Sequence, residues 1–101
     1  MMKLEWSPDA LDDLDAIYDV IALDDEDTAD RFVGELREKA RTLRISPRIG
    51  IKIEELDDEA FRELHYKGYT IVYEIREDAI RVHEVYNQMS DGTLWEVHTA
   101  L

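Results

Sequence analysis

The sequence predicts an α+β fold, a two-layer sandwich in which a helical hairpin packs on a small antiparallel sheet. Two observations predict this fold: a short strand pattern and two amphipathic helical patterns fill the first half of the chain, and three alternating strand patterns fill the second. The expected order is therefore β-α-α-β-β-β. With 101 residues, of which 45% are hydrophobic, the chain has the length and apolar content of one folded domain, residues 1–101.

The first expected elements are a strand and a helix. Leu4 and Trp6 alternate with polar residues, which predicts a strand at 2–6. The Ser-Pro-Asp sequence at 7–9 is typical of a helix start, because Ser caps free N–H groups, Pro suits the first turn and Asp complements the helix dipole. The apolar stripe of this helix, which should end near Leu23, consists of Leu11, Leu14, Ile17, Tyr18 and Ile21.

A second helix is expected after the acidic stretch at 24–27. Asp27 or Thr28 would cap its N-terminus. Because the connection is short, the two helices should form an antiparallel hairpin. The apolar stripe of the second helix consists of Ala29, Phe32, Val33, Leu36, Ala40 and Leu43.

The second half of the chain carries the sheet. Ile-Ser-Pro-Arg-Ile-Gly at 45–50 ends the second helix, and the next residues continue as a loop or an irregular strand. Alternating apolar residues predict strands at about 60–66, 69–75 and 80–87, joined by tight turns and buried on one face. The first strand would join as a fourth, edge strand, and the strand before Ser-Asp-Gly at 90–92 would leave an open edge. The apolar tail residues, which we expect to pack, are Leu94, Trp95, Val97 and Leu101.

Charge and composition exclude several classes of function. The formal net charge of −13 disfavours unaided binding to nucleic acid or to an anionic membrane. The chain has no cysteine, no apolar run that could span a bilayer and no signal-peptide pattern, so we expect a cytoplasmic protein. So many acidic residues are also compatible with a high-salt host. Half of the basic residues gather in one segment: Arg37, Lys39, Arg41, Arg44, Arg48 and Lys52.

Three motifs follow one another along the chain: Leu-Glu-Trp-Ser-Pro with an acidic helix from residue 4, Leu-x-x-x-Pro-x-x-Gly at 43–50, and Arg-x-Leu followed by Tyr-x-Ile-x-Tyr at 62–73. Together they resemble the RelE/ParE superfamily of type II toxins over residues 4–91. The resemblance implies the layered fold described above and a toxin that a cognate antitoxin holds inactive. One branch of the superfamily cleaves mRNA on the ribosome. The ParE-like branch inhibits DNA gyrase without cutting a nucleic acid.

The cations of the mRNA-cleaving branch are missing, so we favour the ParE-like branch. The resemblance implies Lys and Arg on the middle strands and an Arg after the last strand, where this chain has Glu63, His65 and the neutral segment 87–90. RNA cleavage needs neutralised phosphate charge together with an acid and a base. A glutamate repels phosphate, and amides cannot replace a guanidinium.

Four residues remain as catalytic candidates. The two histidines would meet across adjacent strands, and histidine can serve as acid or base near neutral pH. We favour a structural role for these residues, because the alternation of the strands places some of them on the solvated face of the sheet. No two histidines have metal-ligand spacing on one element, so we expect neither a metal nor another cofactor. The candidates are His65, His83, Tyr86 and Arg81.

Binding of a partner protein is predicted in and around the basic segment. Arg48 and Lys52 in the linker would attract an acidic antitoxin segment against the overall negative field, whereas Arg41 and Arg44 satisfy the helix dipole. Arg62 would either contact the partner or pair with one of the many acids. The apolar part of the same binding site would be Ile45 and Ile49.

The sequence leaves three other interpretations open. The chain could be an mRNA endonuclease that uses the two histidines and Tyr86, a non-toxic family member kept as a binding module, or an unrelated structural protein with the same layers. As a ParE-like toxin it would form either a homodimer or a heterotetramer with its antitoxin.

Overall fold

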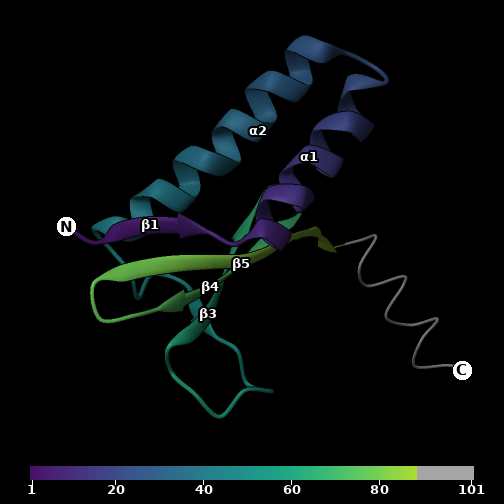
Figure 1. Cartoon of the computed structure of the whole chain (residues 1–101). Helices are drawn as coiled ribbons and strands as arrows, with labels where there is room; N and C mark the ends of the chain where they lie inside the picture. The colour runs from purple at the N-terminus through teal and green to yellow at the C-terminus, as the bar shows by residue number, and fades with distance from the viewer. Residues whose placement is uncertain (89–101) are drawn as a thin grey trace, which may run out of the picture.

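The structure, a computed structural model, describes residues 1–88 and confirms the predicted α+β fold (Figure 1). Two helices lie on one side of a mixed sheet, and the expected order of elements is found. The elements are β1 (Lys3–Trp6), α1 (Pro8–Ala22), α2 (Glu26–Arg41), the 3-10 turn η1 (Thr42–Arg44), β2 (Ile51–Lys52), β3 (Phe61–Tyr66), β4 (Tyr69–Ile75) and β5 (Ala79–Asn87).

The sheet has five strands in the order β1-β5-β4-β3-β2. Strands β2 to β5 pair antiparallel, as expected, but β1 pairs parallel with β5, from Lys3 opposite Ala79 to Trp6 opposite Val82. Three details of the prediction are therefore wrong. The sheet is not wholly antiparallel; it has five strands instead of four, because the segment after residue 50 forms the strand β2; and the strand before residue 90 is no open edge, because β1 covers it. A four-residue alternation carries no information about the direction in which it pairs.

Both helices begin at capped residues. The Ser7 hydroxyl accepts a hydrogen bond from the Ala10 backbone N–H at 3.0 Å, as its sequence position predicts. Helix α2 begins earlier than predicted, because the extended residue Asp25 caps it and accepts from the Asp27 N–H at 3.0 Å. Thr28, one of the two predicted caps, instead donates its hydroxyl to Asp25. This bond, together with the backbone bond from Asp27, lowers the pKa of Asp25.

The core lies between the helices and the sheet. Leu14 of α1 and Leu36 of α2 are almost completely buried, and they pack with a set of sheet residues: Leu64, Ile71, Tyr73, Ile80, Val82 and Val85. Neither helix covers the opposite face of the sheet (Figure 1). Within residues 1–88 no helix is long and apolar enough to span a bilayer. The tail predicted to pack, from Leu94 to Leu101, lies outside the described residues.

A bulge in β5 interrupts the central pairing. Val72 lies opposite Glu84 and Tyr73 lies opposite Val82, so His83 is an extra residue in β5. The N-terminal part of α1 and its cap residue form hydrogen bonds with β5 beside this bulge. The Ser7 hydroxyl donates to the His83 carbonyl at 3.1 Å, and Asp13 accepts from the Val85 N–H at 2.9 Å. The irregular backbone is therefore satisfied by side chains at the start of the chain.

Candidate functional site

The buried Tyr73 forms hydrogen bonds with the segment that connects α2 to β3, which we call the linker. The Tyr73 hydroxyl donates to the Pro47 carbonyl at 2.7 Å and accepts from the Gly50 N–H at 3.0 Å. A Cβ atom on Gly50 would lie 2.5 Å from that hydroxyl and 2.8 Å from the Glu63 carbonyl, so only glycine fits. Burial raises the pKa of Tyr73, which keeps the hydroxyl protonated for its donor role. The Pro-x-x-Gly and Tyr-x-Ile-x-Tyr motifs therefore meet in one contact.

Arg62 fastens the same linker. Its guanidinium donates to the Gly50 carbonyl at 3.0 Å and to the Glu59 carbonyl at 3.2 Å, with Arg48's carbonyl at 3.5 Å. Among the described residues Arg62 has no ion pair, so the alternative in which it pairs with an acid is not found; backbone carbonyls take the place of the carboxylate. A contact between Arg62 and a partner protein stays a prediction.

The fastened linker exposes a group of apolar and basic side chains. We call this group the linker patch; it consists of Ile45, Arg48, Ile49, Ile51 and Lys52. The side chains of Ile45, Ile49 and Ile51 are exposed to 76%, 59% and 60%, and both basic residues are exposed. Three large apolar residues exposed so close together in the chain are typical of an interaction site. The patch also includes β2, which pairs with β3 on one side only among the described strands.

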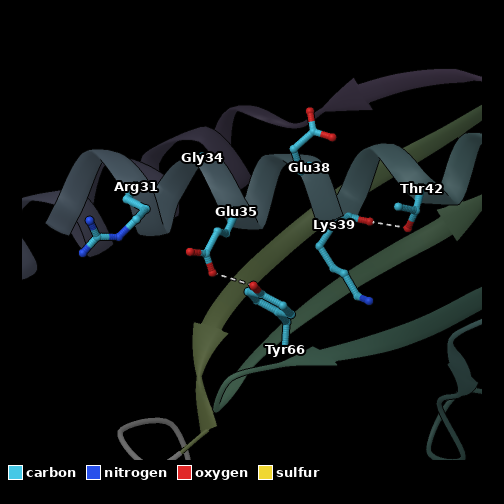
Figure 2. Close-up of a pocket in the computed structure, with 7 residues that line it drawn as sticks. All are labelled: Arg31, Gly34, Glu35, Glu38, Lys39, Thr42 and Tyr66. Carbon is cyan, nitrogen blue, oxygen red and sulfur yellow. Dashed lines mark hydrogen bonds between the residues drawn. The ribbon is translucent and has the colours of Figure 1, made fainter. Parts of the chain in front are cut away.

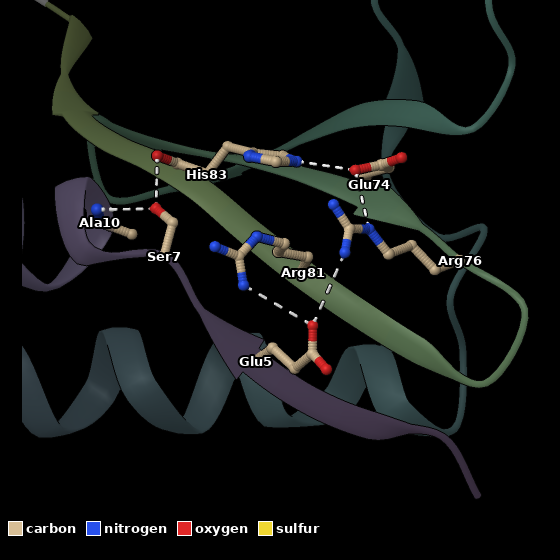
Figure 3. A network of polar contacts seen from close by, with 7 residues as sticks. All are labelled: Glu5, Ser7, Ala10, Glu74, Arg76, Arg81 and His83. Carbon is tan, nitrogen blue, oxygen red and sulfur yellow. Dashed lines mark hydrogen bonds and ion pairs between the residues drawn. The ribbon is translucent and has the colours of Figure 1, made fainter.

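The uncovered face of the sheet carries a network of polar contacts (Figure 3). His83 Nε2 lies 2.8 Å from Glu74, which also accepts from Arg76 Nε at 3.1 Å. Arg81 and Arg76 lie 3.7 and 4.0 Å from the same oxygen of Glu5. Burial raises the pKa of Glu74, but the hydrogen bonds from His83 and Arg76 more than offset it, so that this pKa lies below its ordinary value. The carboxylate therefore stays ionised at neutral pH.

The two candidate histidines do not meet, which corrects the sequence-based expectation. His65 lies on β3 and His83 on β5, and β4 separates the two strands. His65 Nε2 lies 3.2 Å from a carboxylate oxygen of Glu63, and His65 Nδ1 forms a hydrogen bond with the side-chain amide nitrogen of Gln88. His83 instead stacks on Phe61, with ring centroids 5.7 Å apart. Each ring therefore has its own set of neighbours.

The structure also locates Tyr86 and shows how the possible metal ligands are arranged. Tyr86 lies on β5 at a pocket shared with Asp13 and Val20 of α1. Within residues 1–88 no three His, Asp or Glu side chains are grouped as metal ligands would be. The last two residues of the neutral segment, Met89 and Ser90, lie outside the described part of the chain.

A surface pocket of about 400 Å³ lies between α2 and the end of β3 (Figure 2). The Tyr66 hydroxyl donates to Glu35 at 2.5 Å, and Lys67 donates to the same oxygen at 2.9 Å. These two bonds lower the pKa of Glu35, and the bond to Glu35 raises the pKa of Tyr66. Sequence reasoning missed this pocket, although a glycine inside a helical pattern was a signal for it. We call it the α2 groove; it is lined by Arg31, Gly34, Glu35, Glu38, Lys39, Thr42 and Tyr66.

Comparison with known proteins gives one family match. The family described as "ParE toxin of type II toxin-antitoxin system, parDE" matches residues 4–92. Among solved structures, a chain of the chromosomal ParDE TA system from P. aeruginosa is similar, with a TM-score of 0.71 and 22% identity over 86% of this chain and 96% of that one. The conserved hypothetical protein HP0894 from Helicobacter pylori has a TM-score of 0.55 and 18% identity over 88% and 97%. At these identities the two structures establish the shared fold. No curated protein matches the chain significantly.

Proposed function

Because the chain belongs to the ParE toxin family of type II toxin–antitoxin systems, we propose that it arrests growth by binding a protein target in the cytoplasm and that a cognate antitoxin neutralises it. DNA gyrase is the target we propose, on the basis of the resemblance to the ParE-like branch. In this proposal the toxin acts by contact with another polypeptide and cuts no nucleic acid.

One observation carries the choice of binding over cutting. A carboxylate lies beside three of the four catalytic candidates: Glu63 beside His65, Glu74 beside His83 and Glu5 beside Arg81. A phosphodiester would have to approach these carboxylates, and their charge opposes the negative charge that develops in RNA cleavage. The net charge of −13 opposes the same approach at longer range.

The linker patch supports the antitoxin part of the proposal. Arg48 and Lys52 form no ion pair within the described residues, so an acidic segment could pair with both. The exposed isoleucines would bury apolar area against the same segment, and the free side of β2 could accept an added strand. Charge, apolar area and unpaired backbone groups thus favour one kind of partner, an acidic chain with apolar residues.

The proposal is tested by inducing the chain in cells, alone and together with the protein encoded by the adjoining reading frame. We expect growth arrest with induction of the SOS response and intact mRNA, and we expect co-expression to relieve the arrest. The purified chain should inhibit supercoiling by gyrase in vitro. Cleaved mRNA on translating ribosomes would overturn the proposal in favour of the endonuclease, and growth without arrest would overturn it in favour of a non-toxic binding module.

A further inference from the structure

A second pocket lies on the helix side of the sheet, between α1, the first residue of β4 and the last residues of β5. Its volume of about 260 Å³ is below the roughly 300–1,000 Å³ typical of small-molecule sites, so it has room for one large side chain rather than for a metabolite. Val20 on its wall is 69% exposed, and burial of a valine side chain is favourable. We call this pocket the α1 groove; it is lined by Asp13, Ala16, Ile17, Val20, Tyr69, Val85, Tyr86 and Asn87.

The walls of the α1 groove are held by the rest of the fold and include one hydrogen-bond acceptor. Ile17 packs against the core, and the Tyr69 ring lies 5.0 Å from the Phe32 ring, centroid to centroid. Asp13 accepts from the Val85 N–H through one carboxylate oxygen, and its other oxygen accepts no hydrogen bond within residues 1–88. Burial raises the pKa of Asp13, as expected for a carboxylate in a weakly hydrated place. The groove therefore suits an apolar side chain that also carries an N–H donor.

The last described residues of the chain lie at the rim of this groove. Asn87 lines the groove, and the Gln88 N–H donates to the Gly68 carbonyl at 2.8 Å. This bond holds the end of β5 beside the turn between β3 and β4. Residues 89–101, whose apolar side chains the sequence predicts to pack, therefore begin next to the groove.

These residues include a side chain that matches the groove. Ser-Asp-Gly at 90–92 favours a turn, and the uncharged Thr-Leu-Trp at 93–95 follows it. Trp95 combines a large apolar ring with a single N–H donor, and a buried indole N–H usually finds an acceptor. At about 3.3 Å per residue, residues 89–95 reach up to about 23 Å, enough to turn back over a groove that the end of β5 already borders.

We propose that the α1 groove is the docking site of the chain's own segment 93–95, with the Trp95 ring against Val20 and its indole N–H bonded to the second oxygen of Asp13. Two arguments favour the chain's own segment over a separate molecule. A segment tethered at the rim is present at an effective concentration of about millimolar, so even a small groove is occupied. The Asp13 carboxylate and the net charge of −13 repel both an acidic partner and a second copy of the chain.

A segment docked in this groove lies on the helix side of the sheet. It leaves uncovered the polar network around Glu74 and His83 on the opposite face (Figure 3). The inference concerns the chain alone and does not depend on the proposed function.

Fluorescence tests the docking directly, because the chain has two tryptophans, Trp6 and Trp95. In a Trp6→Phe background we expect Trp95 to emit at a shorter wavelength than it does in a synthetic peptide of residues 89–101. Acrylamide should quench it about threefold less than in the peptide, because a docked ring is shielded from water. Emission and quenching equal to those of the peptide would overturn the inference.

Thermal unfolding measures what the docked ring contributes to stability. Trp95→Ala in the otherwise unmodified chain should lower the melting temperature by about 4–8 °C. Trp95→Phe keeps an aromatic ring but lacks the N–H, so it should recover only part of this loss. Full recovery in Trp95→Phe would remove Asp13 from the site, and an unchanged melting temperature in Trp95→Ala would overturn the docking itself.

Two acidic substitutions on α1 locate the docked ring. Val20→Asp places a carboxylate in the groove and should raise the quenching of Trp95 to the value of the peptide. Leu23→Asp adds the same charge at the C-cap of the same helix, where Leu23 is 89% exposed and outside the groove, and should leave Trp95 shielded. Both variants should keep the fold, which circular dichroism checks, because both native side chains are exposed. Equal effects of the two substitutions would overturn the site, and shielding that disappears on dilution would overturn it in favour of docking between two copies.

Discussion

Replacement of Gly50 by alanine should destabilise the protein by loosening the linker from the sheet. The new methyl group would lie 2.5 Å from the Tyr73 hydroxyl, 2.8 Å from the Tyr73 ring and 2.8 Å from the Glu63 carbonyl. All three atoms belong to the packed sheet, and Tyr73 itself is completely buried, so the neighbours cannot move aside cheaply. The linker must move instead, and the Gly50 N–H then loses its contact with Tyr73.

The expected cost combines two terms. Overpacking of this kind costs about 1–3 kcal/mol, and the lost hydrogen bond adds about 1 kcal/mol to the destabilisation. The free energy of unfolding should therefore fall by about 2–4 kcal/mol, which corresponds to a melting temperature lower by about 10–25 °C for a domain of this size. Thermal unfolding followed by circular dichroism measures this shift directly.

The same substitution at Gly34 is the matched control. It adds the same methyl group where nothing lies within 4 Å, and should stabilise the chain by about 0.5–1 kcal/mol. In a Tyr73→Phe background the nearest clashing atom is gone, so Gly50→Ala should cost about 1 kcal/mol less than in the unmodified chain. A melting temperature of Gly50→Ala within about 2 °C of the unmodified protein would refute the steric reasoning.

Three further predictions concern charge, catalysis and pH. Arg48→Glu with Lys52→Glu should weaken antitoxin binding about tenfold and flatten its salt dependence in calorimetry; unchanged affinity at low salt would remove the linker patch from the interface. His83→Ala should leave growth arrest intact, and loss of arrest in a stably folded variant would reopen the endonuclease. Burial raises the pKa of Asp13, so its ionised form opposes folding; this unfavourable contribution disappears as pH falls through that pKa, so the melting temperature of Asp13→Asn relative to the unmodified chain should fall over the same pH range. Asp13→Ala should cost about 1 kcal/mol at neutral pH, since it leaves the Val85 N–H unpaired, and equal stabilities of the two variants would contradict this role.

Local patterns in the sequence predicted most of the fold. The Ser7 cap, the two apolar helical stripes and the alternation in β4 act over a few residues, and each predicted element lies where expected to within a few positions. The sequence did not show which of several neighbouring polar residues caps a helix. Asp25, Asp27 and Thr28 are all good caps, and only the extended backbone of Asp25 distinguishes it.

Features that depend on distant parts of the chain could not be predicted in the same way. The parallel pairing of β1 and the bulge at His83 arise where residues 3–7 meet β5, 76 positions further along the chain. Gly50 and Tyr73 belong to two separate sequence motifs, and their contact across 23 positions appears only in the fold. The α2 groove was missed for the same reason, because Tyr66 comes from β3 and the other lining residues from α2 and η1. Side chains brought together by the topology leave no periodic signal.

The pairing of the first strand with the last described strand also bears on biosynthesis. Lys3 to Trp6 are synthesised before Ala79 to Val82 and have no partner strand until these residues have followed them. Contacts between such distant segments form slowly, because a long loop must close first. The sheet therefore lacks its β1 edge until Ala79 to Val82 have been synthesised, even though β2 to β5 can pair without it.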